Sequence, residues 1–148
     1  MTRRSLEVKA WKLFSRCVRL GAADHNGFCQ CFTCGTSKHW KQIDAGHWIG
    51  CGKKATKYHI DNVRPQCKQC NKWGHPKLYR TRGEPVAFEY NLQNEGVDTE
   101  ELKLLSDGSG YRSEEDLEEL VDDLRDTLKL TVATAIIRGV MDAQDALK

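Results

Sequence analysis

No run of about 18 or more apolar residues, the length typical of a membrane-spanning helix, occurs in this sequence. The first residues, Met-Thr-Arg-Arg-Ser-Leu, lack the apolar core of a secretory signal. The chain also has no internal repeat and no low-complexity tract. We therefore expect a soluble, cytoplasmic protein with no membrane partner.

Cysteine, in contrast, is plentiful, with seven in 148 residues. Without a secretory signal, metal ligation is favoured over a disulfide framework. Four of the seven form two Cys-x-x-Cys pairs: Cys31 with Cys34, and Cys67 with Cys70. Paired motifs of this kind are typical of a tetrahedral structural Zn²⁺ site, and a small chain often needs a metal for stability.

Three thiols remain outside these pairs. Cys29 lies so close to the first pair that it is an alternative ligand. Cys17 falls on the apolar side of an expected helix, and Cys51 lies in a basic loop. We expect all three to be packed or free thiols.

The net charge of +2 conceals a division of the chain. Residues 1–82 carry 17 Lys and Arg against 4 Asp and Glu, a net charge of +13. Residues 83–148 carry 6 basic and 17 acidic side chains, a net charge of −11. A basic segment around the cysteine motif indicates a polyanionic partner, nucleic acid. We therefore expect a basic zinc-containing domain (1–82) and an acidic helical extension (83–148).

Apolar spacing and turn residues predict an α+β fold with short strands. The expected elements are a helix over 6–20 ended by Gly21, a knuckle turn at 31–35, a strand over 43–49, a weaker strand around 58–60, a short helix from Asn71, and helical turns at 86–93 and 99–105.

Ser113, followed by three acidic residues, predicts the start of a long C-terminal helix. Its apolar stripe begins at Leu117, and the helix is expected to extend towards Ala146. The stripe has two interpretations, a partner helix in a homodimer or packing on its own domain.

Polar residues suited to catalysis surround the cysteine pairs. His47 and Asn62 lie between the pairs, and Asn71 and His75 follow the second pair. If a helix begins at the second pair, Asn71 and His75 occupy positions i and i+4, which share a helix face. Two ligands could then reach one cation.

The resemblance to a known family rests on four stretches: Asp44-Ala45-Gly46-His47, Tyr58 to Asn62, Gln66-Cys67-Lys68-Gln69-Cys70-Asn71, and Tyr79-Arg80. They resemble the NinG (Rap) recombination proteins of lambda-type phages and, more broadly, the HNH or His-Me finger endonucleases with a treble-clef zinc site. The resemblance implies a ββα-metal core that cuts DNA at branched recombination intermediates, such as Holliday junctions and D-loops, in the host cytoplasm.

The resemblance also implies roles for single residues. His47 lines up with the general base that deprotonates the attacking water, and Asn62 with the Asn that orients it. Asn71 and His75 line up with the ligands of a catalytic Mg²⁺ or Mn²⁺. Many relatives have a ligand directly before the base, where this chain has Gly46. Asp44, on the same strand face, is the expected substitute, with a hydrogen-bonding role as the alternative.

The expected phosphate contacts are Lys53, Lys54, Lys57, Arg64, Lys68, Lys72, Arg80 and Arg82. Trp48 and Trp73 flank the expected site, where either core packing or stacking on unpaired bases is open, with packing favoured.

We therefore expect a metal-dependent DNA endonuclease with an HNH-type core. The alternatives are a non-catalytic zinc-dependent DNA-binding protein and a decoy-like interaction protein that uses the acidic half. His47 separates the first two, because binding alone has no use for a base beside a metal.

Overall fold

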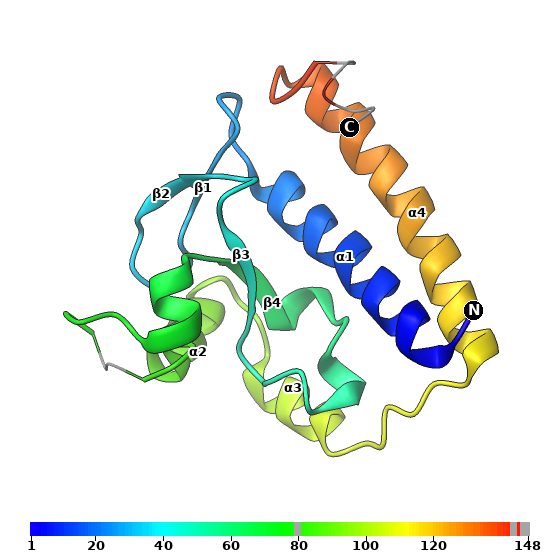
Figure 1. The fold of residues 1–148 in the computed structure, drawn as a ribbon. Helices are drawn as coiled ribbons and strands as arrows, with labels where there is room; N and C mark the ends of the chain where they lie inside the picture. Colours follow the sequence, from blue (N-terminus) through cyan, green and yellow to red (C-terminus); the bar gives the residue numbers. More distant parts are fainter. Residues whose placement is uncertain (79–80, 143–144, 146–148) are drawn as a thin grey trace.

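The computed structural model describes residues 1–78, 81–142 and 145 and has the expected α+β class (Figure 1). Its helices are α1 (Arg3–Ala22), α2 (Pro85–Asn94), α3 (Thr99–Ser106) and α4 (Glu114–Ile137). Its strands are β1 (Phe28–Gln30), β2 (Ser37–His39), β3 (Asp44–His47) and β4 (Val63–Gln66). Short turns of 3₁₀-helix, η1 (Lys54–Thr56) and η2 (Ile60–Asn62), and a π-helical segment, η3 (Gln69–Trp73), complete the described elements. No helix in the described part of the chain is long and apolar enough to cross a membrane.

Helix α1 forms where its apolar spacing predicted. Thr2 caps its start, because the Thr2 side chain accepts a hydrogen bond from the Ser5 amide. Leu6, Ala10 and Phe14 then recur at helical spacing and are buried. The opposite face of α1 is polar and basic, so the helix separates an apolar interior from a charged surface.

Helix α4 runs alongside α1 in the same direction (Figure 1). Cys17 lies beside Leu124, and further along both helices Gly21 lies beside Thr131. The prediction that Gly21 ends α1 is wrong, because the helix continues to Ala22 with Gly21 facing α4. Packing of the C-terminal helix on its own domain is confirmed.

One buried cluster joins α1, the strands β3 and β4, and α4. Its members are Leu6, Ala10, Phe14, Val18, Ala45, Val63, Leu117, Val121 and Leu124. The change of charge at residue 82 therefore does not separate two cores. A homodimer remains a prediction, and it would have to use the other side of α4, where Leu130 and Ile137 are exposed.

The two ends of α4 differ in how well they were predicted. Ser113 forms the expected cap, as part of a capping box with Asp116. The predicted continuation towards Ala146 is wrong, because Gly139 adopts a φ of 77° and the Val140 amide bonds back to the carbonyl of Ala135. Ala146 itself lies outside the described residues.

Leu117→Ala tests the packing of α4. Leu117 is 1% exposed within the shared cluster, so truncation should lower the free energy of unfolding by about 2–5 kcal/mol. Urea unfolding followed by circular dichroism measures the change. Leu130→Ala, on the same helix but 72% exposed, is the control and should stay within about 0.5 kcal/mol of wild type. Equal losses in both variants would contradict the packing.

The strands form two antiparallel pairs, β1 with β2 and β3 with β4. The strand over 43–49 is confirmed in its central part, but the one predicted around 58–60 is wrong, since the partner of β3 is β4. Residues Ile60–Asn62 instead make a 3₁₀ turn, which the Asn62 side chain fastens to the backbone of Ile49 and Thr56. Pro65 is tolerated in β4 because this strand has one partner only.

Gly46 is required in β3 because the space beside it is already occupied. A Cβ at this position would lie 2.1 Å from Oε1 of Gln66, whose side chain is fully buried. The space beside Gly46 therefore holds Gln66. The Asp44 carboxylate points instead towards Lys68 and Asn71.

Candidate metal centre and active-site cleft

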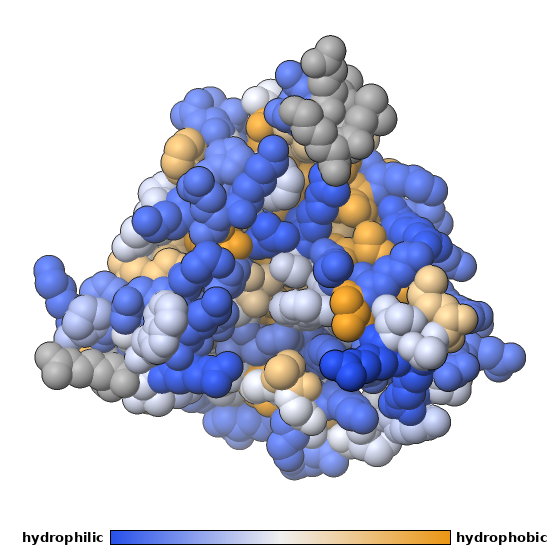
Figure 2. Space-filling view, viewed as in Figure 1, coloured by the Kyte–Doolittle hydropathy of each residue, from blue (hydrophilic) through white to orange (hydrophobic). Residues whose placement is uncertain are grey.

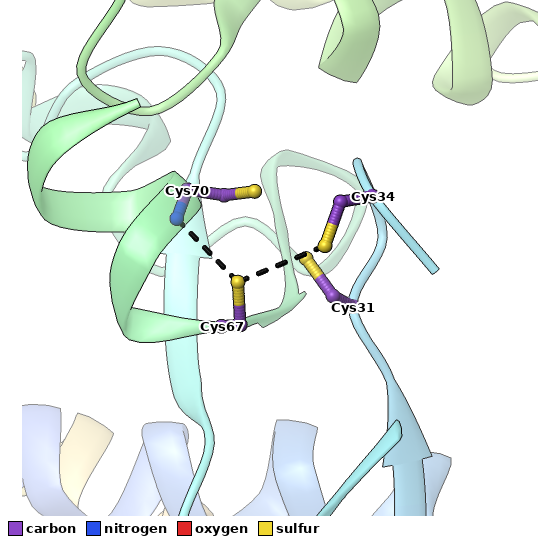
Figure 3. A group of neighbouring side chains, drawn as sticks. All are labelled: Cys31, Cys34, Cys67 and Cys70. Carbon is purple, nitrogen blue, oxygen red and sulfur yellow. Dashed lines mark hydrogen bonds between the residues drawn. The ribbon is translucent and has the colours of Figure 1, made fainter. Parts of the chain in front are cut away.

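The two Cys-x-x-Cys pairs converge as predicted. Cys31 and Cys34 lie in the segment between β1 and β2, while Cys67 directly follows β4 and Cys70 lies in η3 (Figure 3). Their four Sγ atoms all lie within 4.8 Å of one another. Tetrahedral Zn²⁺ with Zn–S bonds of about 2.3 Å places the sulfurs about 3.8 Å apart. The Cys34 and Cys67 sulfurs are 3.8 Å apart, so the four side chains fit a structural zinc ion.

The surroundings of the cluster suit thiolates. Burial by itself would raise the pKa of Cys31, but hydrogen bonds from the Thr33 hydroxyl and nearby amides hold that pKa at about 7. Burial raises the pKa of Cys67 and Cys70. Burial therefore opposes their ionisation, and a bound zinc ion would supply the positive charge that two buried thiolates need.

The three other thiols are separate from the cluster. Cys29 is buried and lies 3.1 Å from the Arg19 carbonyl oxygen, and burial raises its pKa to about 11. Cys17 contacts α4, and Cys51 is exposed. The prediction that these residues are packed or free thiols is confirmed.

A cleft of about 830 Å³ lies between α1 and β3, within the size range of ligand-binding sites. Figure 2 shows that hydrophilic side chains cover most of the face of the molecule that is seen in Figure 1. The cleft is lined by Arg4, Glu7, Val8, Trp11, Lys12, Ser15, Arg19, Lys41, Ile43, Asp44, Ala45, His47, Cys51, Lys57, Lys68, Asn71 and Arg82. Cations outnumber carboxylates among these residues, so the cleft attracts anions.

His47 stands at the end of β3 and faces this cleft. Its Nε2 lies 2.9 Å from the carbonyl oxygen of Lys57, and a carbonyl can only accept, so Nε2 carries the proton and donates. Nδ1 is then left as a base. The ring stacks on Trp11, with centroids 4.8 Å apart. Burial lowers the pKa of His47, which keeps the ring neutral near pH 7.

Asn62 is fully buried and holds the loop after β3. Its side-chain oxygen accepts from the Ile49 amide at 2.8 Å, and its Nδ2 donates to the carbonyls of Ile49 and Thr56. The same loop supplies the Lys57 carbonyl that binds His47, so Asn62 and His47 are both bonded to the backbone of this loop.

Asp44 and Asn71 meet at the other side of the cleft. Nδ2 of Asn71 donates to Oδ2 of Asp44 at 3.1 Å, and Nζ of Lys68 donates to Oδ1 at 2.8 Å. Burial opposes the charge of Asp44, but these two bonds outweigh it and lower its pKa. Asp44 is therefore an ionised carboxylate that accepts hydrogen bonds from an ammonium group and an amide at one side of the cleft.

His75 does not join this pair. The π-helical segment ends at Trp73, and Gly74 follows with a φ of 81°, so the helical i and i+4 relation predicted for Asn71 and His75 is wrong. The His75 amide donates to Glu84, and its Nδ1 accepts from the Lys77 amide. His75 lines a second cavity, of about 420 Å³, beside Cys67.

The predicted phosphate contacts are divided among several places. Lys57, Lys68 and Arg82 line the cleft, while Lys53, Lys54 and Lys72 are exposed outside it. The Arg64 guanidinium is instead engaged by Glu95 at 3.1 Å and by backbone carbonyls. Arg80 lies outside the described residues.

The two tryptophans differ. Trp73 is 65% exposed, so the favoured prediction of core packing is wrong for this residue. Trp48 is half-buried, with Lys103 over its ring.

We did not predict from the sequence that α1 forms one wall of the cleft. Trp11 lies on this wall, together with the basic side chains of α1. These basic side chains repeat at helical spacing, and this pattern was the available signal.

Comparison with known proteins identifies the family of this chain. The family model described as "NinG: Bacteriophage Lambda NinG protein" matches residues 2–88, more than half of the chain. The matched range includes α1, both sheets, the four cysteines and every predicted catalytic residue. Neither the curated proteins nor the solved structures gave a match.

Proposed function

Since the chain belongs to the NinG family of bacteriophage lambda, which indicates a role in phage recombination, we propose that it acts there as a metal-dependent DNA endonuclease. One observation carries the proposal. A histidine whose Nδ1 has no hydrogen-bond partner among the described residues faces a basic cleft that also contains an ionised carboxylate paired with an amide.

His47 is the general base of the proposed reaction. Its Nδ1 takes a proton from a water molecule, whose oxygen bonds to the phosphorus of the scissile phosphodiester while the bond from phosphorus to the leaving oxygen breaks. The hydrogen bond from Nε2 to the Lys57 carbonyl fixes the tautomer and stabilises the imidazolium that results. The stacked Trp11 fixes the plane of the ring.

Asp44 and Asn71 are the proposed ligands of a Mg²⁺ or Mn²⁺ ion. Among the described residues, the four cysteines are the only group of three or more His, Cys, Asp or Glu side chains placed to hold a metal. Mg²⁺ is commonly held by one or two carboxylates together with water and substrate phosphate, so the pair suffices. The ion would stabilise the charge that develops on the phosphate and the leaving oxygen.

The zinc site serves as scaffold in this proposal. It joins the turn before β2 to the segment that carries Asn71, and so fixes Asn71 relative to Asp44 on β3. The strands β3 and β4 are followed in the chain by η3, and the cysteine cluster lies beside them. This arrangement resembles a ββα-metal core of the HNH class. This likeness supports the class, and the family's association with recombination favours branched DNA as substrate.

Cleavage of labelled linear, flapped and four-way DNA tests the proposal. We expect cutting with Mg²⁺ or Mn²⁺ and none in chelator. Asp44→Asn removes the charged ligand and should raise the Mn²⁺ concentration for half-maximal rate at least about ten-fold, the lower range seen for outer-shell mutations of metal sites. Asp61→Asn, whose carboxylate lies 4.0 Å from Arg64 and outside the cleft, should leave it unchanged. Binding without cutting under every condition would favour the non-catalytic zinc-dependent DNA-binding protein instead.

A further inference from the structure

We infer that the face of α1 that lines the cleft forms a nucleic-acid-binding wall opposite β3. This wall holds the phosphate backbone of one strand against β3 and His47. This inference rests on the proposed function, because it takes nucleic acid as the occupant of the cleft. It assigns binding to α1, whereas the sequence pointed to the loop after β3 and to the segment after the zinc site.

The face consists of one stripe on α1. Arg4, Val8, Lys12, Ser15 and Arg19 all line the cleft, and their spacing of three or four residues places them on one side of the helix. The buried stripe of Leu6, Ala10 and Phe14 lies on another side and packs into the core.

Cations on this stripe are available to a ligand. Within the described part of the chain, neither Arg4 nor Lys12 has a hydrogen-bond or ion-pair partner for its side chain, and both are exposed. Arg19 is different, because its guanidinium bonds to the carbonyls of Ser15 and Trp40. Lys41 adds a further cation at the same end, beside the Trp40 ring.

The acidic groups of the cleft are already engaged. Glu7 lies 3.6 Å from Arg3, and Asp44 accepts from Lys68 and Asn71. The free cations of α1 are therefore not neutralised from within the cleft. A polyanion is the ligand that would neutralise them.

The position of α4 restricts where that polyanion can lie. Helix α4 runs alongside α1 (Figure 1). It shares the apolar cluster with the buried stripe of α1, whereas the basic stripe lines the cleft. The many carboxylates of α4 repel phosphates, so a nucleic acid approaches α1 only from the cleft side.

The length of the stripe suits a strand. Arg4 and Arg19 are 15 residues apart, which is about 22 Å at the rise of an α-helix. A strand of B-form DNA rises about 3.4 Å per nucleotide, so the stripe spans about six nucleotides. Phosphates along such a strand would pass between α1 and the His47 side of the cleft.

Fluorescence anisotropy with a labelled four-way DNA junction, in chelator to prevent cutting, tests the inference. Each lost phosphate contact removes about 0.9 from the slope of log affinity against log salt, which is about a five-fold loss of affinity at about 0.15 M salt. Arg4→Ala with Lys12→Ala should therefore weaken binding roughly 30-fold and reduce the slope by about two. Lys12→Glu should weaken it further than Lys12→Ala.

Lys9→Ala and Lys9→Glu are the matched controls, because Lys9 lies on α1 outside the cleft lining. Circular dichroism of all variants checks that the helix is intact. Unchanged affinity and slope in the Arg4 and Lys12 variants, or equal losses in the Lys9 variants, would overturn the inference even if the wild type cuts DNA. A wild type that binds through α1 but never cuts would overturn the nuclease and leave the binding wall in place.

Discussion

His47→Ala is expected to lower DNA cutting by about 10²–10⁴-fold, the usual contribution of a general base, while DNA binding stays near wild type. The alanine cannot take the proton of the attacking water. The basic side chains that line the cleft remain, so phosphates still bind. Single-turnover cutting with Mn²⁺ and anisotropy in chelator measure the two effects separately.

The pH dependence of the wild type gives a second readout of the same group. Burial lowers the pKa of His47, so the base is neutral at and above neutral pH. The cutting rate should rise with pH through a pKa below the ordinary value for histidine and then level off. His47→Ala should lose this rise, and added imidazole should restore part of the rate.

His25→Ala is the control for this substitution, because His25 lies in an exposed turn outside the cleft. It should keep both the rate and the pH profile. Wild-type cutting by His47→Ala would remove His47 from the mechanism.

The features that could be predicted from the sequence are those with a local cause. The Cys-x-x-Cys spacing fixes where two thiolates meet one ion, and the four sulfurs do converge. Ser113 and Asp116 cap α4 through bonds that span three residues. The helical spacing of Leu6, Ala10 and Phe14 likewise predicts α1 and its buried side.

The features that could not be predicted depend on contacts distant in sequence. Gly46 could not reveal that the Gln66 side chain fills the space beside it, because the position of β4 was not known. His75 appeared to continue a helix, yet Gly74 ends the segment and turns the chain away. A partner strand distant in sequence decided the first outcome. In the second, Gly74 ended the segment and the His75 amide bonded to Glu84, which residue spacing alone does not specify.

The cleft shows the same limit. His47 was identified from its motif, but its neighbours Trp11 and Lys57 come from α1 and from the loop after β3. The packing of α1 against β3 and β4 brings Trp11 next to His47. That packing depends on α4, because Leu117 and Val121 belong to the cluster that holds α1 in place.

Cys67→Ser should abolish zinc binding and unfold most of the protein. Structural zinc contributes about 10–16 kcal/mol in small zinc-binding peptides, comparable to or greater than the roughly 5–15 kcal/mol that stabilises a whole domain. Cys67 is buried, and its Sγ accepts a hydrogen bond from the Cys70 amide at 3.4 Å. A serine at this position would remove one of the four thiolate ligands from the buried site. Metal content by mass spectrometry and thermal unfolding by circular dichroism measure the loss.

Two other thiols supply the controls for the zinc site. Cys51→Ser changes an exposed thiol, and Cys29→Ser changes the thiol that bonds to the Arg19 carbonyl rather than to the cluster. Both should retain one zinc per chain, and the second tests whether Cys29 replaces a cluster cysteine. A Cys67→Ser protein with full zinc and an unchanged melting temperature would show that the four cysteines are not the ligands. A zinc-free wild type of normal stability would show that the fold does not need the metal, because the apolar cluster shared by α1 and α4 would then suffice to hold it.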